Sequence, residues 1–293
     1  LKSNGCGPQQ PMFLNNSHTS EISDDELLID PHCHSRYSDG LSTPRSMFRK
    51  ARQRGLHGLI ITDHDTVLHW PDTLEAAQRY EMATALGIEL STAQGHLLAY
   101  FNPRVKQRAV ARALKLDDGC LHYWHVSTVI KRIRDLGGVT VIPHPFGPFY
   151  PLGSDHFGEV DGVEEYNAWI FKDSRHSRNA FGAGKKHGIA ATGGSDSHYP
   201  YTIGFGATAV PKNTDFLAHD WWLKCIRNKA TRPVVRQTIA HRRINYLKFG
   251  VSIPLSMRYN AKFWRSKWRG YWRDNYRHLI AGGKLMEKIR KEF

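Results

Sequence analysis

LLIDPHCHSRYSDG, residues 27–40, joins a short apolar run to a dense group of polar side chains. The run LLID is typical of a buried strand, and His32 and His34 follow it directly, with Asp39 a few residues later. In an extended segment, residues two apart point to the same side, so the two imidazoles face one way, as a shared metal ion requires. A lone HxH pair is weak evidence in a chain with 17 histidines, so the rest of the sequence has to decide.

Strand and helix signals alternate on both sides of this stretch. Helix 43–55 is marked at both ends, by Thr43 and Pro44 at its start and Gly55 at its end. Strands are predicted at 27–30, 56–65, 88–92, 96–101, 139–145, 162–168 and 189–198, and helices at 43–55, 71–87, 127–138 and 177–188. Such alternation predicts an α/β fold with a parallel sheet.

Composition divides the chain into three parts. Residues 1–26 are rich in Gly, Pro, Gln, Asn and Ser, which predicts a mostly disordered leader. Residues 27–237 carry the alternating pattern. Residues 238–293 hold 14 Lys and Arg against three acidic residues, and so contribute +11 of the net charge of +14.

The sequence gives few indications of a membrane span, a signal peptide or disulfide bonds. No apolar run approaches the roughly 20 residues that span a bilayer, and no signal peptide is visible. The four cysteines form no CxxC pair, and a 293-residue chain is not a small disulfide-rich secreted domain. We therefore expect free thiols and a cytoplasmic protein.

Imidazoles and carboxylates recur where the predicted strands end. The full set is His32, His34, Asp39, His64, Glu89, His96, His144, Asp196 and His198. In a parallel barrel the carboxyl ends of the strands meet at one mouth, where the loops build the active site. Mixed imidazole and carboxylate ligands suit Zn, Mn or Fe. Taken singly, each of these histidines is more often a hydrogen-bonded core or surface residue.

The order of these motifs resembles that of a known family. HxH with YSDG, then ITDHDT, GIE, HLL, HP, EEYN and TGGSDSH is similar to the series found in the PHP (polymerase and histidinol phosphatase) metal-dependent phosphoesterases. The resemblance covers about residues 27–236. It implies a distorted (β/α)7 barrel, here followed by a basic helical extension, and two or three divalent metal ions.

The resemblance also implies a ligand set for each ion. His32, His34, Glu89 and Asp196 would hold the first ion; Glu89, His96 and His144 the second; Asp39, His64 and His198 the third. Many relatives carry a large helical insertion over the site. Only 42 residues separate Phe101 from His144 here, which favours an open mouth.

Further roles follow from the expected phosphate chemistry. A hydroxide bridging two ions would attack phosphorus, and His198 or a metal-bound water would protonate the leaving alcohol. Asp63 and Asp65 would orient ligand imidazoles, or else cap their loops. Asn167 and Arg178 would contact the substrate, a phosphorylated small molecule, a nucleotide or a nucleic-acid end. A solvated helix face is the alternative for Arg178, as for Lys185 and Lys186.

The basic tail repeats an aromatic residue followed by arginine every four positions, as in WRSKWRGYWRDNYR, 264–277. On a helix this spacing forms adjacent aromatic and arginine stripes. Three interpretations stay open: packing of the aromatic stripe on the barrel, peripheral binding to an anionic membrane surface, and nucleic-acid binding.

The function favoured by the sequence is metal-dependent hydrolysis of a phosphate ester. The rival is a non-catalytic PHP scaffold whose tail binds nucleic acid or membrane. Because all nine expected ligand positions are filled, the sequence favours catalysis. It does not define the natural substrate, the metal or the oligomeric state.

Overall fold

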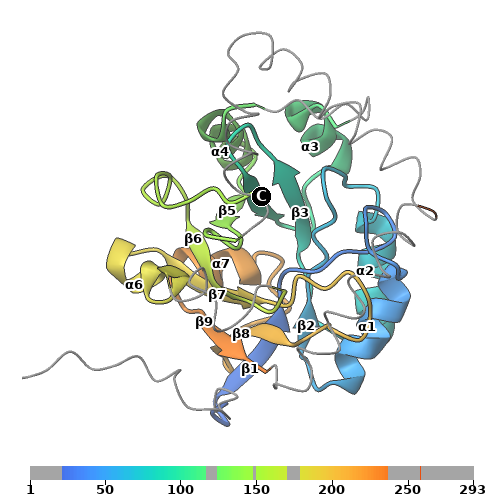
Figure 1. Ribbon diagram of the computed structural model, residues 1–293. Coiled ribbons are helices and arrows are strands. Elements are labelled where there is room, and N and C mark those ends of the chain that lie inside the picture. The colour runs from blue at the N-terminus through green and yellow to red at the C-terminus, as the bar shows by residue number, and fades with distance from the viewer. Residues whose placement is uncertain (1–21, 117–123, 148–149, 170–178, 237–257, 259–293) are drawn as a thin grey trace, which may run out of the picture.

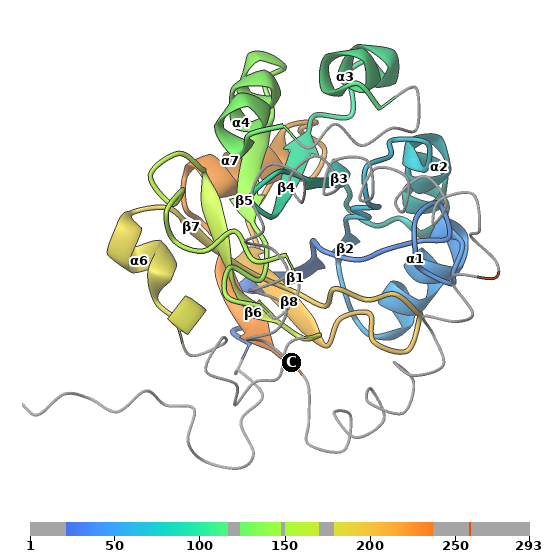
Figure 2. The same cartoon turned by 45° about the horizontal axis from the view of Figure 1, so that its top comes forward.

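The computed structural model describes residues 22–116, 124–147, 150–169, 179–236 and 258. Two mixed sheets form the interior, and helices α1 to α4 and α6 lie outside the strands (Figures 1 and 2). The strands are β1 (Glu26–Asp30), β2 (Gly58–Leu59), β3 (Leu86–Ser91), β4 (His96–Phe101), β5 (Val139–Ile142), β6 (Gly162–Asn167), β7 (Ala190–Gly194), β8 (Gly206–Pro211) and β9 (Arg232–Val235). The helices are α1 (Pro44–Gln53), α2 (Trp70–Tyr80), α3 (Gln107–Leu114), α4 (Val126–Asp135), α6 (Ala183–His187) and α7 (Trp221–Arg227).

The expected α/β class is confirmed, but the sheets are mixed rather than parallel. One sheet has the order β2-β1-β8-β9, and the other has the order β3-β4-β5-β6-β7. Parallel pairing joins β1 to β2 and runs through β5, β6 and β7. Antiparallel pairing joins β3 to β4 and β4 to β5, and places β8 between β1 and β9.

The predicted (β/α)7 barrel is not confirmed, because the described strands do not pair into one closed sheet. Within the described residues, isolated bridges occur between segments of the two sheets, at Gly58 and Ala83, His64 and Glu89, and Cys33 and Ser197. Asp65 and Asp196, beside two of these bridges, have left-handed backbones with φ of 52° and 50°. Such residues interrupt a regular strand, so each contact stays a single bridge.

Helix α1 begins and ends where its sequence predicts. Thr43 caps the helix by accepting a hydrogen bond from the Ser46 amide at 3.2 Å, and Pro44 occupies the first turn. Gly55 follows the helix with φ of 71°, a conformation that glycine adopts without strain. Met47, Phe48 and Ala51 form the buried face.

Helix α2 is shorter than predicted. It ends at Tyr80 instead of 87, and Glu81 adopts a left-handed conformation with φ of 50°. The next residues pair with β2 instead: the Leu59 amide donates to Ala83 O at 3.0 Å, and the Ala83 amide donates to His57 O at 3.0 Å. Strand pairing in the folded chain thus overrides the helical propensity of this segment.

The predicted helix at 177–188 is interrupted: Asn179 and Ala180 are helical, Gly182 has φ of 81°, and α6 begins at Ala183, while residues 177 and 178 lie outside the described residues. Strand 56–65 keeps regular pairing only at Gly58–Leu59, although its later residues still bond to neighbouring segments. Helices α3 and α7 and strands β8 and β9 were not predicted. Among the described helices, none has the length and apolar character needed to cross a membrane.

The sequence predicts a disordered leader at residues 1–26 and a basic helical tail at residues 238–293. Strand β1 begins at Glu26, beside the predicted boundary at 26 and 27. Most of the expected leader, and all of the expected helical tail at 238–293 except Arg258, lie outside the described residues. The three interpretations of the tail therefore stay predictions. Cys33 and Cys225 are free and buried, as expected for thiols in a reducing compartment.

Candidate metal centre

The fold gathers all nine expected ligand side chains in one buried cluster. Each side chain belongs to a strand or to the segment that follows a strand. His32, His34 and Asp39 follow β1, His64 follows β2, Glu89 lies on β3, His96 opens β4, His144 follows β5, and Asp196 and His198 follow β7. Three groups of these side chains bring donor atoms close enough to hold an ion: His32, His34, Glu89 and Asp196; His64, Glu89 and His96; and His34, Asp39, His64 and His198.

Five of the six donor separations in the first group are close to those of a tetrahedral site. His32 Nε2 and His34 Nε2 each lie 3.1 Å from Glu89 Oε2 and 3.3 Å from each other. Asp196 Oδ1 lies 3.1 Å from His34 Nε2 and 3.5 Å from His32 Nε2. Four ligands about 2.1 Å from a zinc ion lie roughly 3.4 Å apart at the corners of a tetrahedron. The donor set therefore fits a single small divalent ion.

Glu89 connects this group to a second one. Its Oε1 lies 2.8 Å from His96 Nδ1 and 3.2 Å from His144 Nε2, while its Oε2 faces the first group. The expected second set of Glu89, His96 and His144 is therefore brought together. His64 also approaches Glu89, with Nδ1 3.6 Å from Oε2. One carboxyl group can in this way serve two ions.

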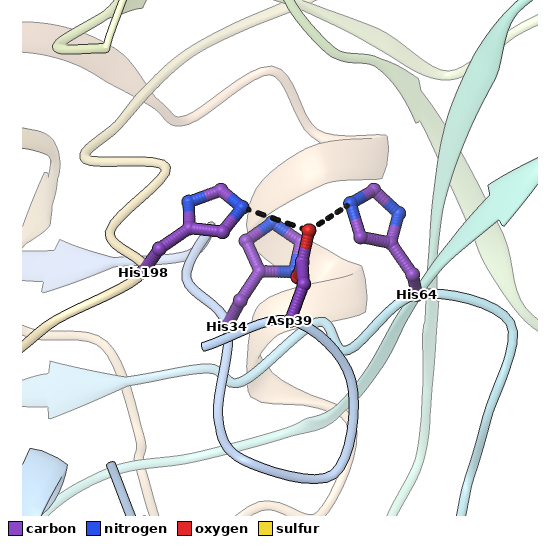
Figure 3. A group of neighbouring side chains, drawn as sticks. All are labelled: His34, Asp39, His64 and His198. Carbon is purple, nitrogen blue, oxygen red and sulfur yellow. Dashed lines mark ion pairs between the residues drawn. The ribbon is translucent and has the colours of Figure 1, made fainter. Parts of the chain in front are cut away.

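The third group surrounds Asp39 (Figure 3). Asp39 Oδ2 lies 3.2 Å from His198 Nε2 and 3.6 Å from His64 Nε2. The other ring nitrogen of His34, Nδ1, lies 3.8 Å from Asp39 Oδ1. His34 thus faces the first group with one nitrogen and the third with the other. The donor atoms here are more widely spaced than those around Glu89.

The buried carboxylates of the cluster need positive charge close to them. Burial acts to lower the pKa of His34, but hydrogen bonds to Asp196 and Glu89 outweigh it and raise the pKa to about 10. Burial acts to raise the pKa of Glu89, but the imidazoles of His64, His96 and His32 hold it well below its usual range. Buried carboxylates therefore need cations beside them, either protonated imidazoles or metal ions.

A ring nitrogen without a hydrogen-bond partner also fits metal ligation. Nδ1 of His34 is buried and faces Asp39 of the third group, and no hydrogen-bond partner is found for it among the described residues. Buried polar atoms normally have a partner, and exceptions indicate an ion or another function. The donor set, its spacing and this nitrogen all fit divalent metal ions.

Asp63 anchors the loop that carries Asp39. Asp63 Oδ1 accepts hydrogen bonds from the Ser35 amide at 2.7 Å and the Ser38 hydroxyl at 2.6 Å, and its Oδ2 accepts the Ser35 hydroxyl at 2.5 Å. His69 Nδ1 lies 3.3 Å from the same Oδ2. These contacts match the loop-capping interpretation of Asp63 rather than a contact with a ligand imidazole.

Asp65 lies in the same segment after β2 as Asp63, and it anchors the next strand, β3, in a similar way. Its two oxygens accept the Ser91 amide at 2.7 Å and the Ser91 hydroxyl at 2.8 Å. These bonds hold the end of β3, two residues after Glu89. Asp65 thus anchors backbone close to a candidate ligand, as a loop cap does.

Glu164 is the orienting carboxyl group that sequence reasoning missed. Its Oε1 lies 2.9 Å from His32 Nδ1, and its Oε2 accepts the His144 amide at 2.9 Å. Asn167 Nδ2 donates to Glu164 Oε2 at 2.8 Å and to Asp196 Oδ2 at 3.1 Å. The available signal was the pair Glu164–Glu165 in GVEEYN, because only one of two neighbouring strand residues faces the site.

The two predicted substrate contacts have different outcomes. Asn167 is buried beside Asp196, where its amide supports a candidate ligand. Arg178 lies outside the described residues. Lys185 and Lys186 are exposed on α6, which agrees with a solvated helix face.

Two aromatic side chains stand over the candidate ligands. Tyr150 is 45% exposed and stacks on His96, with ring centroids 5.1 Å apart and planes 17° apart. Trp169 lies over His198 at a centroid distance of 5.1 Å. These rings border the cluster on two sides.

Comparison with known families agrees with the motif order. The family model of the PHP domain matches residues 30–124, and the model of the PHP-associated region matches residues 175–219. The resemblance to PHP proteins is thus confirmed for these two parts of the chain.

Three proteins are similar to all or part of the chain. An uncharacterized protein from Methanocaldococcus jannaschii is 26% identical over 156 residues, which cover 49% of this chain and 83% of that protein. A 5'-3' exoribonuclease from Salmonella typhimurium is 38% identical over 68 residues, covering 22% of this chain and only 23% of that enzyme. A two-domain protein from Bacteroides vulgatus, containing a predicted PHP-like metal-dependent phosphoesterase, has a similar fold, with a TM-score of 0.57 and 17% identity over 75% of this chain and 69% of that chain.

We expect Glu164→Gln to weaken metal binding about 10- to 100-fold, because the substitution removes the carboxylate that orients His32. Titration calorimetry with Mn²⁺ and Zn²⁺ measures the change. Glu165→Gln is the matched control, since Glu165 is also buried but accepts the Gly184 amide at 2.8 Å, away from the cluster. Equal affinity losses in both variants would show a general effect on folding instead.

Asp63→Asn should lower the free energy of unfolding by about 1–3 kcal/mol, because one carboxyl oxygen is replaced by an amide that cannot accept the serine hydrogen bonds. Urea denaturation of the metal-free protein measures this loss. Ser38→Ala removes only one of those bonds and should cost less. An Asp63→Asn protein as stable as the wild type would contradict the anchoring role.

Proposed function

We propose that the protein is a metal-dependent phosphoesterase that hydrolyses a phosphate ester. The observation that carries this proposal is the first donor group, in which four buried side chains bring their donor atoms together, with five separations of 3.1–3.5 Å that fit a tetrahedral metal site. The match of residues 30–124 to the PHP domain and the similar fold of a protein with a predicted PHP-like phosphoesterase support it. A scaffold without activity would have no need to keep all nine ligand side chains in one cluster.

We assign the side chains to three ions as the motifs suggest. His32, His34, Glu89 and Asp196 hold the first ion, Glu89, His96 and His144 the second, and Asp39, His64 and His198 the third. When bound, such ions supply Lewis-acid activation of water and neutralise charge on the phosphoryl oxygens. Zn, Mn and Fe all suit this mixture of imidazole and carboxylate.

The residues of the chain prepare this chemistry before the substrate arrives. The Glu164 carboxyl group accepts a hydrogen bond from His32 Nδ1, which leaves the lone pair of Nε2 directed at the first group. Asn167 holds one oxygen of Asp196 and leaves the other to face His34. Preorganised donors need no rearrangement during the reaction, which is the main requirement for electrostatic stabilisation.

His198 fits the role of ligand better than that of proton donor. Its Nδ1 lies 3.0 Å from the Asp196 carbonyl oxygen, which can only accept, so Nδ1 carries the proton. The lone pair then lies on Nε2, which faces Asp39 at 3.2 Å. Water at the open mouth is therefore the better source of a proton for the leaving group.

The proposed substrate class is a nucleotide or a nucleic-acid end. One relative that matches part of the chain is a 5'-3' exoribonuclease, and its name supports this class over unrelated small phosphomonoesters. Exposed Tyr150 offers an aromatic surface beside the cluster. The free thiols of Cys33 and Cys225 fit a cytoplasmic location, where such substrates are abundant.

The decisive experiment is hydrolysis by the Mn²⁺-loaded protein of nucleoside monophosphates, nucleoside bisphosphates, histidinol phosphate, and short RNA and DNA. The double variant His32→Ala, His34→Ala should lose at least about 1,000-fold in kcat, because both substitutions remove ligands of the first ion. His219→Ala, which removes an exposed imidazole distant in sequence from the candidate ligands, should retain activity. Activity that survives the double variant, or no turnover of any substrate by metal-loaded protein, would contradict the proposal.

A further inference from the structure

A strongly basic surface, separate from the metal cluster in its residues, lies on helices α3 and α4 and the residues beside them. We call it the α3–α4 basic face, and it consists of Arg104, Lys106, Arg108, Arg112, Lys115, Lys131, Arg132 and Arg134. All of these side chains are exposed except Arg132, which is partly buried. Within 102–116 and 124–137 they meet only one acidic residue, Asp135. Asp117 and Asp118 follow in the sequence but lie outside the described residues.

The two helices lie next to each other (Figure 2). Arg132 of α4 donates a hydrogen bond to the carbonyl oxygen of Ala113 in α3 at 2.6 Å. The Arg132 guanidinium also lies 3.7 Å from the centre of the Trp124 ring, and Lys115 Nζ lies 5.5 Å from it. The cations of both helices therefore meet at Trp124.

On α3 the charges form a row. Arg108 and Arg112 are four residues apart, which places them on one side of the helix with about 5–6 Å between their Cβ atoms. Lys115 is the first residue after the helix, has a left-handed backbone with φ of 52°, and extends the basic stretch. No salt bridge to these three side chains is found among the described residues. A row of solvated cations suits a ligand with regularly repeated negative charges.

The basic residues of α1 are in a different position. Helix α1 packs against α2, which carries acidic side chains, and Arg52 Nη1 lies 3.6 Å from Glu81 Oε2 just after α2. On the α3–α4 basic face Asp135 pairs with Lys131 at 2.7 Å, and Glu159, beside α4, pairs with His156 at 2.7 Å. Among the described residues neither acid forms an ion pair with Arg108, Arg112 or Lys115, so the charge of these three side chains is left for a partner.

The apolar residues of α3 argue against a membrane as that partner. Val110, Ala111 and Leu114 are buried in the core, where they pack with residues of α4 and β4. An interfacial helix needs an apolar face to insert among lipids. Among the described residues, the large exposed hydrophobic side chains all lie outside α3 and α4.

The face also approaches the metal cluster at one end. The Gln94 side chain accepts the amide of Val126, the first residue of α4, at 2.9 Å, and the Ala93 amide donates to Trp124 O at 2.9 Å. Gln94 lies two residues before His96, a candidate ligand. A strand held along the face would therefore pass close to the mouth of the site.

We propose that the α3–α4 basic face binds the sugar–phosphate backbone of single-stranded nucleic acid. Each Lys or Arg that meets a phosphate releases condensed counterions, so binding is salt-dependent and largely independent of base sequence. The surface needs no metal ion and no hydrolysis. It is therefore tested separately from the proposed phosphoesterase function.

The test is fluorescence anisotropy of a fluorescein-labelled single-stranded RNA with the full chain in EDTA, over a range of salt concentrations. The triple variant Arg108→Gln, Arg112→Gln, Lys115→Gln should bind at least about tenfold more weakly at low salt. Its plot of log affinity against log salt should be shallower by about 2, because each lost phosphate contact contributes roughly 0.7 on a single strand. The charge-matched control is Arg45→Gln, Arg49→Gln, Lys50→Gln on α1, which should change affinity less than about twofold.

Three results would overturn the proposal. Unchanged binding by the α3 variant would assign the nucleic acid to another part of the chain, such as the basic tail. Equal weakening by both triple variants would show dependence on net charge alone. Sedimentation with phosphatidylserine vesicles that the α3 variant abolishes, without any effect on RNA, would assign the face to a membrane. Mn²⁺-dependent hydrolysis of a small phosphomonoester, measured in parallel, reports on the phosphoesterase function whatever the binding result.

Discussion

Glu89 shares its two carboxyl oxygens between two sets of imidazoles, and the architecture of the site depends on this arrangement. Oε2 faces His32 and His34, and Oε1 faces His96 and His144. A buried carboxylate in this position is stable only with positive charge on both sides. Divalent ions supply that charge, so we view the cluster as a set of ligands held ready for metal.

Much of the surrounding structure holds these side chains in place. Asp63 fixes the loop after β1, Asp65 fixes the end of β3, and Glu164 fixes His32 and the backbone of His144. The need to hold these side chains in place also explains why the described strands do not form a closed barrel. The left-handed backbones of Asp65 and Asp196 sit where the sheets meet, and there irregular backbone positions side chains at the expense of strand pairing.

The cluster and the α3–α4 basic face would bind phosphate through different kinds of electrostatic interaction. In the buried cluster, charges act at short range and are little screened by salt. On the exposed face, cations act through counterion release, and their effect falls as salt rises. An enzyme that combined the two would hold a strand loosely along its surface and select a single phosphate by geometry.

The sequence by itself determined the alternating α/β pattern, the ends of α1, the PHP motif order and the nine side chains that converge. These features depend on local spacing and on residue type, both of which can be read directly from the sequence. Tertiary structure decided the early end of α2, where pairing of Ala83 with β2 overrides helical propensity, and the antiparallel pairing of β3, β4 and β8. It also decided that Asp63 binds a loop while Glu164, distant by 132 residues, orients His32. The direction of a carboxyl group depends on neighbours remote in sequence, so no local pattern could assign it.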